Sequence, residues 1–393
     1  MAKDYTFKNT IPYAPLKIVA MDNCKAFGEK VDEYIVGFRK NDQEILQARE
    51  ANYEFRGYDR DSYLVSTKCP RFGSGEAKGM INESVRGSDL FIICDVTNYS
   101  QTFKMYGKDH MMSPDDHYQD MKRIIATAMT SARRVNVIMP FLYESRQHKR
   151  TSRESLDCAM ALEELVQMGV SNIITFDAHD PRIQNAIPLH DFDSFPCVYQ
   201  FMKALTQKDQ TLNLDKDHLM IISPDEGAMG RSVYLANNLG VDMGMFYKRR
   251  DYSRVVNGKN PIVAHEFLGS DVTGKTVIVV DDMIASGDSM LDTTRELKER
   301  GAKNVIVFCT FGLFTNGFEN FDRYHDAGYF DYIVTTNLNY RKPEIYEKSW
   351  YVEADMTKYV ATIINTLNHD VSLSDVMSHT DKLQKLINNY KKN

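Results

Sequence analysis

The chain has 393 residues, of which 43% are hydrophobic and 26% charged, and its formal net charge is −6. This length allows two domains with separate cores, and the composition is ordinary for a globular protein. The acidic balance gives no electrostatic reason to expect nucleic acid or an anionic membrane as a partner. No apolar run has the length of a membrane span, and the N-terminal residues lack the apolar region of a signal peptide, so a cytoplasmic location is expected.

The first half of the chain alternates apolar strand candidates with helical patterns. An amphipathic helix is expected around residues 27–38, strands at 90–94, 134–140 and 172–176, and a helix at 156–168 that ends at Gly169. Residues 98–120 show no clear period and are interpreted as an insertion. The His and Asp side chains of that segment are expected to be solvated rather than to bind a metal.

The pattern starts again after a proline-bearing connector, residues 188–196. Strands are expected at 218–222, 243–247, 277–280 and 332–336, and helices follow at 290–297, 356–367 and from about 373 onward. The segment 248–274 is long and polar, and its position suggests a lid over the site. Strands that alternate with helices predict an α/β fold with mostly parallel sheets.

Polar residues follow the strands wherever a strand ends. They are Arg146 and Gln147, His179, Asp225, Lys248 with Arg250, and Asp281 with Asp282. In a parallel sheet the carboxyl ends of the strands meet at one edge, where ligands of open α/β sheets bind. Lys248 and Arg250 lie two apart on a strand, so both side chains are expected on one face, where they would stabilise a transferred anionic group.

The stretch VIVVDDMIASGDSM, residues 277–290, predicts a binding site by itself. An apolar strand leads to Asp281 and Asp282, a loop of small residues follows, and a helix begins. The loop residues are Ala285, Ser286, Gly287, Asp288 and Ser289. Backbone N–H groups at such a helix N-terminus suit a phosphate, and the carboxylates suit the vicinal hydroxyls of a sugar. Together these features predict a site for a phosphorylated ribose.

This stretch resembles the ribose-phosphate motif of type I phosphoribosyltransferase folds, in the version found in ribose-phosphate pyrophosphokinases. Four further segments match that family in order. They are Ser74-Gly75-Glu76 before Val85-Arg86-Gly87, the pair Arg146-Gln147, the TFDAHDPRIQ segment around His179, and SPDEGAMGR with Asp225. The similarity extends in patches from residue 72 to about 364. Ala285, Asp288, Ser74 and His148 depart from the usual family residues.

The resemblance implies two tandem phosphoribosyltransferase-like domains, each a mostly parallel sheet flanked by helices. The expected boundaries are 1–195 for an N-terminal domain with the ATP motifs, 196–350 for a C-terminal domain with the ribose-5-phosphate loop, and 351–393 for a helical tail that packs on the N-terminal domain. The family transfers the β,γ-diphosphoryl group of ATP to the C1 hydroxyl of ribose 5-phosphate, giving AMP and phosphoribosyl diphosphate for nucleotide biosynthesis.

By position, the resemblance implies a role for each matched residue. Ser74, Gly75, Glu76, Arg146 and Gln147 would bind ATP; Asp281, Asp282, Arg250 and residues 285–289 would bind ribose 5-phosphate; His179 and Asp225 would serve Mg²⁺. A homo-oligomer, either a hexamer or a dimer-based assembly, is also implied. Two alternatives stay open. One is a non-catalytic regulatory paralogue, motivated by the departures from the family residues, and the other is a nucleobase phosphoribosyltransferase.

Overall fold

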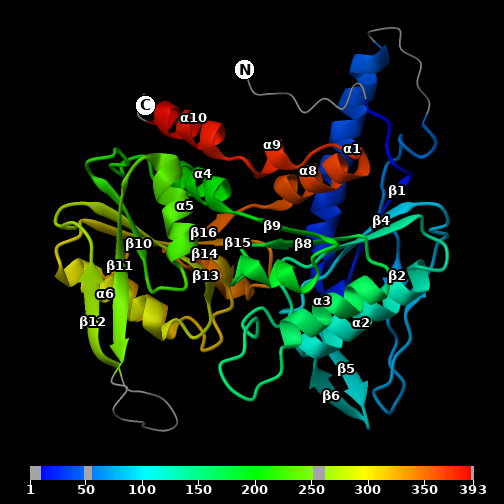
Figure 1. Ribbon diagram of the computed structural model, residues 1–393, viewed down its shortest axis with the longest axis horizontal. Coiled ribbons are helices and arrows are strands. Elements are labelled where there is room, and N and C mark those ends of the chain that lie inside the picture. The colour runs from blue at the N-terminus through cyan, green and yellow to red at the C-terminus, as the bar shows by residue number, and fades with distance from the viewer. Residues whose placement is uncertain (1–9, 48–54, 251–261, 391–393) are drawn as a thin grey trace. The chain divides into compact units, whose positions relative to one another are not determined.

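The computed structural model describes residues 10–47, 55–250 and 262–390 (Figure 1). For residues 43–47, 248–250 and 262–265 only the backbone is described. The chain divides into two compact units. Unit 1 comprises Met1–Phe195, Asn337–Tyr340 and Met356–Met377, and unit 2 comprises Pro196–Thr336, Arg341–Asp355 and Ser378–Asn393.

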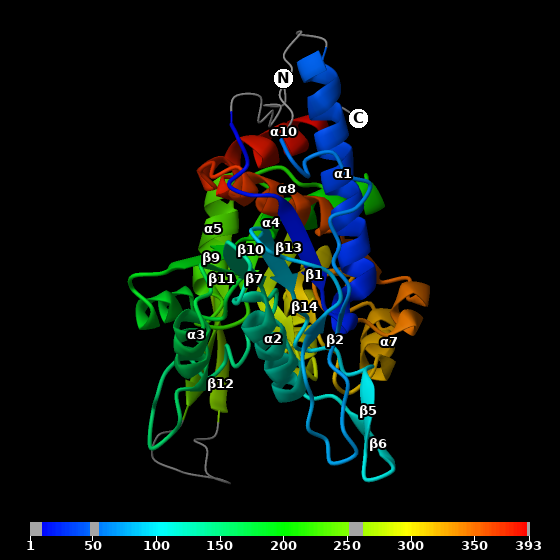
Figure 2. The same ribbon diagram turned by 90° about the vertical axis from the view of Figure 1, so that its right-hand side faces the viewer.

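Unit 1 is built on a five-stranded sheet in which all neighbours are parallel and the order is β1-β4-β7-β8-β9. These strands are β1 (Leu16–Ala20), β4 (Asp89–Ile93), β7 (Arg134–Ile138), β8 (Asn172–Phe176) and β9 (Asp191–Phe195). The helical elements are η1 (Asp22–Cys24), α1 (Lys25–Gln47), α2 (Pro114–Ala128), α3 (Asp157–Gln167), η2 (Pro181–Ala186), α8 (Thr357–Asn368) and α9 (Ser374–Met377). Helix α1 lies against β1 and α8 (Figure 2).

The strands predicted from short apolar runs are confirmed in β4, β7 and β8. Every residue of β4 and of β8 is buried, as expected of parallel strands covered on both faces. Two strands of this five-stranded sheet were missed. β1 lies in a part of the chain for which only a helix was expected, and β9, with its sequence DFDSF, lies in the segment interpreted as a connector. Because β9 is at the sheet edge, it carries charged side chains and lacks the apolar signal.

The segment 98–120 is more regular than its sequence suggested. It begins with an antiparallel hairpin of β5 (Thr102–Met105) and β6 (Lys108–Met111), and α2 starts within it at Pro114. Ser113 caps α2 through a reciprocal pair of hydrogen bonds with Asp116, and Pro114 occupies the first turn. The expectation that its His side chains are solvated is wrong for His117. That residue is buried and hydrogen-bonded to Asn23 and to the Asn98 carbonyl. A second small hairpin joins β2 (Thr67–Lys68) and β3 (Met80–Ile81).

Unit 2 contains a seven-stranded sheet of order β12-β11-β10-β13-β14-β15-β16, parallel except for the β11–β12 pair. The strands are β10 (Leu219–Ser223), β11 (Asp242–Arg250), β12 (Ile262–Leu268), β13 (Thr276–Ile284), β14 (Asn304–Gly312), β15 (Tyr332–Thr336) and β16 (Tyr351–Ala354). The helical elements are α4 (Val198–Lys208), α5 (Met229–Leu239), α6 (Asp288–Glu299), α7 (Glu319–Asp326), η3 (Pro343–Glu347) and α10 (Thr380–Tyr390). Helix α5 lies against β10, β11 and β13 (Figure 1).

Two strands of unit 2 run further than the apolar runs predicted. β13 continues past residue 280 to Ile284 because it stays paired with β14, so Asp281 and Asp282 lie inside the strand rather than after it. β11 likewise continues to Arg250, paired with the antiparallel β12. The predicted lid, 248–274, is therefore partly a strand pair. Residues 251–261 of that lid lie outside the described residues.

An aromatic cluster forms part of the core of unit 2. Phe314, Phe318, Phe321 and Trp350 have ring centroids 5.0–6.3 Å apart. Trp350 is 1% exposed and is the only tryptophan of the chain. This cluster packs below the loop that joins β13 to α6, and its fluorescence therefore reports on the neighbourhood of that loop.

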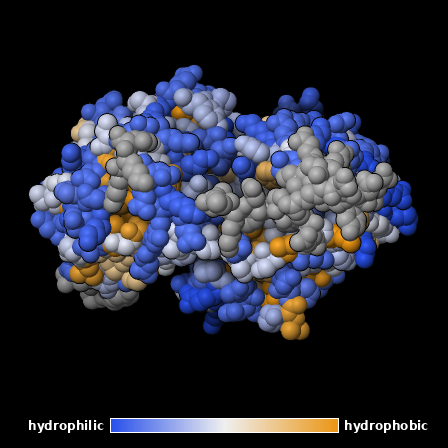
Figure 3. All heavy atoms as spheres, turned by 90° about the horizontal axis from the view of Figure 1, so that it is seen from above, coloured by the Kyte–Doolittle hydropathy of each residue, from blue (hydrophilic) through white to orange (hydrophobic). Residues whose placement is uncertain are grey.

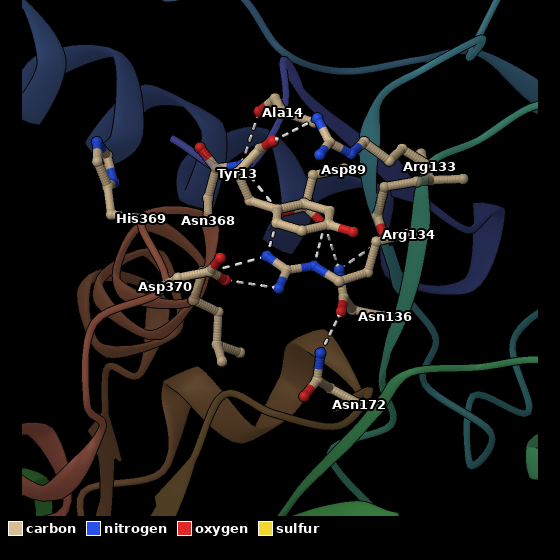
Figure 4. Close-up of polar contacts among 12 residues, drawn as sticks. Tyr13, Ala14, Asp89, Arg133, Arg134, Asn136, Asn172, Asn368, His369 and Asp370 are labelled. Atoms are coloured by element: carbon tan, nitrogen blue, oxygen red, sulfur yellow. Dashed lines mark hydrogen bonds and ion pairs between the residues drawn. The ribbon is translucent and has the colours of Figure 1, made fainter. Parts of the chain in front are cut away.

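A buried polar network in unit 1 joins the amino ends of β4 and β7 to the end of α8 (Figure 4). Asp89 is fully buried, and its carboxylate accepts two hydrogen bonds from the Arg134 guanidinium at 2.8 and 2.7 Å. It also accepts from the Asn136 and Asn368 amides at 2.8 and 2.9 Å. The Arg134 guanidinium reaches Asp370 at 2.7 Å. The network pairs a buried charge completely and fixes α8 against the sheet of its own unit.

The face drawn in Figure 3 is mainly hydrophilic, with apolar side chains in small separate groups. Among the described residues, no helix combines the length and the hydrophobicity that crossing a bilayer would require.

Candidate functional site

The loop between β13 and α6 has the geometry of an anion site. Gly287 is the N-cap of α6 and adopts φ 91°, a left-handed conformation that favours glycine. A Cβ at this position would lie 2.2 Å from Cζ of the buried Phe321 ring, so only glycine fits. The Gly287 carbonyl accepts the first helical bond, from the Leu291 N–H. Gly287 supplies no capping side chain, so the first N–H groups of α6 could donate hydrogen bonds to a phosphate.

The other loop residues frame this N-terminus. The Ala285 carbonyl accepts a hydrogen bond from the Thr315 N–H at 3.0 Å, which fixes the loop to the segment after β14. Asp288 is exposed in the first turn of α6, where a carboxylate interacts favourably with the helix dipole. Ser286 is half-buried and Ser289 is exposed. The structure thus places residues 285–289 in one loop at the carboxyl end of β13.

Asp281 and Asp282 stand at the carboxyl end of the same strand. Their side chains are 23% and 4% exposed. Burial raises the pKa of Asp281 well above its ordinary value, and the neighbouring Asp282 charge raises it further. Below the pair, the buried thiol of Cys309 lies opposite Asp281 in β14, and burial together with both carboxylates raises the pKa of that thiol. Two carboxylates held in this way can accept hydrogen bonds from sugar hydroxyls.

Arg231, on the first turn of α5, was not predicted as a site residue. Its Nη1 atom lies 3.5 Å from Oδ1 of Asp281 and 3.3 Å from Oδ1 of Asp282, and its side chain is 13% exposed. The favourable charge of Arg231 lowers the pKa of Asp281, against the larger effect of burial. A signal was present in the sequence. Arg231 follows Asp225 within one strand–loop–helix unit, so the first turn of α5 carries it to the same sheet edge.

Asp225 lies in the turn between β10 and α5. Its Oδ1 atom accepts hydrogen bonds from the N–H groups of Gly227 and Ala228 at 2.9 and 3.2 Å. Because β10 pairs with β13, this turn is at the same edge of the sheet as Asp281. The side chain is half-buried. Asp225 therefore stabilises the turn through one oxygen, which leaves Oδ2 outside these two bonds.

Lys248 and Arg250 belong to β11, next to β10 in the sheet. Their backbones pair with His265 and Ile262 of β12. Their side chains lie outside the described residues, so the predicted catalytic role of these two cations stays a prediction.

Three predicted ATP residues of unit 1 lie in a tight turn. The Phe72 N–H donates to the Glu76 carbonyl, the Gly75 N–H donates to the Phe72 carbonyl, and the Ser74 hydroxyl donates to Glu76 Oε2 at 2.9 Å. Gly75 adopts φ 96°, and a Cβ there would lie 2.6 Å from Sδ of Met105 in β5. The β5–β6 hairpin thus fixes the shape of this turn.

The basic loop after β7 meets the turn after β8. The His148 and His179 rings are 5.3 Å apart, and His148 Nε2 lies 3.4 Å from Oδ2 of Asp180. Arg182 holds the pKa of Asp180 at about 2. Gln147 donates to the Ser155 carbonyl at 2.7 Å. Arg146 is exposed. The structure therefore brings the Arg146–Gln147 segment and His179 together at the carboxyl edge of the sheet of unit 1.

A cavity of about 130 Å³ lies elsewhere in unit 1. It is lined by the η1 turn, β2, β5 and α2, and it contains none of the predicted site residues. The Asp120 carboxylate in its lining contacts both Arg71 and Arg123 at 2.6 Å. Among the described residues, no cluster of His, Cys, Asp and Glu has the composition of a metal centre.

Comparisons with known proteins agree with this arrangement. Residues 16–169 match the family described as the N-terminal domain of ribose phosphate pyrophosphokinase, and residues 198–346 match the phosphoribosyl transferase domain. A ribose-phosphate pyrophosphokinase of Ralstonia nicotianae is 30% identical over 254 residues, covering 63% of this chain and 70% of the relative. The chain belongs to the ribose-phosphate pyrophosphokinase family.

Another family member, from Vibrio cholerae, is 28% identical over 320 residues, covering 79% of this chain and 90% of the relative. The phosphoribosylpyrophosphate synthetase structure from Mycobacterium smegmatis superposes with a TM-score of 0.67 at 19% identity, covering 90% of this chain and 99% of that one. This structure supports the fold. The predicted family and the predicted fold class are thereby both confirmed.

Proposed function

We propose that this chain is a ribose-phosphate diphosphokinase. It transfers the β,γ-diphosphoryl group of ATP to the C1 hydroxyl of ribose 5-phosphate and releases AMP and phosphoribosyl diphosphate, a precursor for nucleotide biosynthesis. Membership of the family supports this reaction. The single structural observation that supports it most is the β13–α6 loop, in which Gly287 opens a helix N-terminus to a phosphate beside the half-buried carboxylate of Asp281 and the buried carboxylate of Asp282.

The sugar and its phosphate occupy opposite ends of this loop. The 5-phosphate accepts hydrogen bonds from the backbone N–H groups at the start of α6, in residues 285–289, and Asp281 and Asp282 accept from the ring hydroxyls. Arg250 adds a positive charge for the phosphate. A phosphate and two hydroxyls contacted at fixed positions would orient the anomeric hydroxyl for attack, so binding itself lowers the barrier.

The nucleotide contacts unit 1 in this proposal. The residues that would contact it are Ser74, Gly75 and Glu76 in the tight turn, and Arg146 and Gln147 in the basic loop. Arg146 has an exposed guanidinium two residues before His148 in the loop, and its charge suits an anionic nucleotide. The hydrogen bonds that define the turn, and the close approach of Gly75 to Met105, are the observations that favour a binding role for it.

Mg²⁺ fits the groups assigned to it, because this ion is bound by one or two carboxylates together with substrate phosphates and water rather than by a cage of side chains. Asp225 has an oxygen outside its two turn bonds, and His179 carries a ring nitrogen that can face the ion's waters. When bound, the ion would neutralise charge on the ATP phosphates. His179 and Asp225 would orient the nucleotide through it.

The reaction requires no covalent intermediate on the protein. The C1 hydroxyl oxygen forms a bond to the β-phosphorus of ATP, the hydroxyl proton is finally released to bulk solvent, and the bond from that phosphorus to the oxygen of the α-phosphate breaks. Negative charge moves onto the oxygen that leaves with AMP. Lys248 and Arg250 would stabilise this charge as fixed cations, and the segment 248–274 would exclude water that could otherwise hydrolyse ATP. We also propose a cytoplasmic location and a homo-oligomer.

One other function is favoured by particular residues. Ala285, Asp288, Ser74 and His148 stand where family members usually carry other residues, which favours a non-catalytic regulatory paralogue. A nucleobase phosphoribosyltransferase would share the ribose-phosphate loop and would need a base as a second substrate. An assay for AMP and phosphoribosyl diphosphate from ATP, ribose 5-phosphate and Mg²⁺, without any base, separates the three functions. Equal amounts of both products support the diphosphokinase, and no AMP above a protein-free control contradicts it.

A further inference from the structure

We infer that Arg231 is a positioning residue that holds Asp281 and Asp282 as a fixed pair of acceptors and thereby selects a sugar with two vicinal hydroxyls. The inference rests on the proposed function, because it concerns how the ribose-5-phosphate site recognises its sugar. It assigns Arg231 no contact with the substrate.

The contacts of a single guanidinium nitrogen support this role. Arg231 Nη1 lies between Oδ1 of Asp281 and Oδ1 of Asp282, at 3.5 and 3.3 Å. Oδ1 of Asp281 also accepts the backbone N–H of Asp282 at 2.8 Å. Two donors thus hold one oxygen of Asp281, and the carboxylate cannot rotate without losing both. Its second oxygen, Oδ2, takes no part in these contacts and is held in a fixed direction.

Burial makes this arrangement strong. The side chain of Asp282 is 4% exposed, that of Arg231 is 13% exposed, and the thiol of Cys309 lies opposite Asp281 in the sheet. Two adjacent carboxylates at such a site would repel each other, and one of them would take up a proton. Arg231 on α5 and Cys309 on β14 lie against the pair. The charge of Arg231 lowers the pKa of Asp281 against the larger, opposite effect of burial, and so it favours the ionised form of the pair.

An ionised and oriented pair can accept two hydrogen bonds, whereas a protonated carboxyl presents a donor. A sugar that lacks one hydroxyl would leave one carboxylate oxygen of the pair without its hydrogen-bond donor, and its affinity would be lower. The site should therefore discriminate ribose 5-phosphate from 2-deoxyribose 5-phosphate. If Arg231 sets the geometry and the charge of the pair, this discrimination depends on Arg231.

The test measures binding of both sugar phosphates by calorimetry, without nucleotide, between pH 6 and pH 9. The proteins are wild type, Arg231→Gln, Arg231→Lys and Arg300→Gln. Arg300 is a matched control because it belongs to the same unit and pairs with Glu296 on the surface of α6. We expect the wild type and the Arg300→Gln variant to prefer ribose 5-phosphate by about tenfold or more.

In Arg231→Gln, the preference for ribose 5-phosphate should shrink at least threefold. The affinity of Arg231→Gln for ribose 5-phosphate should also rise with pH, as the carboxylate pair loses its extra proton. Arg231→Lys should keep most of the wild-type preference and most of the wild-type pH profile. A merely structural role would lower both affinities equally and leave their ratio and pH profile unchanged. That result, or a wild-type ratio in a folded Arg231→Gln protein, overturns the inference while the proposed function stands. A wild-type protein that binds neither sugar phosphate overturns both.

Discussion

The Gly287→Ala substitution tests the structural basis of the phosphate loop. Two separate effects destabilise the variant, one on the backbone conformation and one on the packing of the core. An alanine at φ 91° adopts a left-handed conformation, which costs about 1–2 kcal/mol. Its Cβ would also lie 2.2 Å from the Phe321 ring, which is fully buried and cannot move freely, and such overpacking costs about 1–3 kcal/mol. We expect unit 2 to lose about 2–5 kcal/mol of stability in total.

A control separates these two costs. Gly240 ends α5 with φ 68°, and apart from its own chain neighbours no atom lies within 4 Å of the position that its Cβ would occupy. Gly240→Ala should therefore lose only the conformational term, about 1–2 kcal/mol. Phe321→Leu supplies a second comparison, because a smaller side chain gives room to the added methyl group. The double variant Gly287→Ala, Phe321→Leu should be less destabilised than the sum of the single variants by at least about 1 kcal/mol.

Urea unfolding followed by tryptophan fluorescence measures these differences. Trp350 is the only tryptophan, and its ring lies 5.7 Å from that of Phe321, so the signal reports on unit 2. In folded Gly287→Ala protein, the affinity for ribose 5-phosphate should fall at least tenfold, because the start of α6 must shift. It should be unchanged in Gly240→Ala. Equal destabilisation by the two alanine substitutions would refute the close packing of Gly287 on Phe321.

Further predictions concern both units. Burial lowers the pKa of His369 to about 4, below its ordinary value of 6.5, so the neutral ring stabilises unit 1 fully above pH 6.5. Unit 1 should lose up to about 3 kcal/mol of stability as the pH falls from 6.5 to 4. Amide hydrogen exchange in β4 measures this loss, which should be smaller in His369→Gln than in the wild type. Arg134→Gln leaves Asp89 buried without its cation and should destabilise unit 1 by about 3–5 kcal/mol in the same measurement; a loss below 1 kcal/mol would contradict the role of the network. Lys248→Ala and Arg250→Ala should each lower kcat by about 10²-fold with little change in KM, and a double variant with wild-type kcat would remove both residues from the mechanism.

The sequence was informative where the pattern is local. Residues 172–176 form β8 as predicted, because a short uncharged run rich in Ile and Phe is typical of a parallel strand that is covered on both faces. The loop at 285–289 was also predictable, since a strand, small residues and a helix follow one another without interruption. The sequence alone does not explain why position 287 is a glycine. The structure does, because a Cβ at this position would collide with the Phe321 ring.

Contacts between distant segments could not be predicted from a periodic pattern. Arg231 lies 50 residues from Asp281, and only the packing of α5 on the sheet brings the two together. Asp370 is 236 residues from Arg134. The strand β9 was missed because an edge strand can carry aspartates, and the start of α2 was missed although Ser113 and Asp116 form a capping box. The contacts of Arg231 and Asp370 and the pairing of β9 share one cause, which is that tertiary pairing decides what a weak local signal leaves open. The start of α2 differs, because its capping box is a local signal that was overlooked.

The transfer of labelled phosphorus tests the central claim most directly. The protein is incubated with ATP labelled at the β-phosphorus, ribose 5-phosphate and Mg²⁺, and the products are separated by chromatography. We predict that the label enters phosphoribosyl diphosphate in the same amount as AMP forms. In Asp281→Asn the rate of this transfer should be at least tenfold lower. Label that stays in ADP, or label found in inorganic diphosphate independently of ribose 5-phosphate, would contradict diphosphoryl transfer to the sugar.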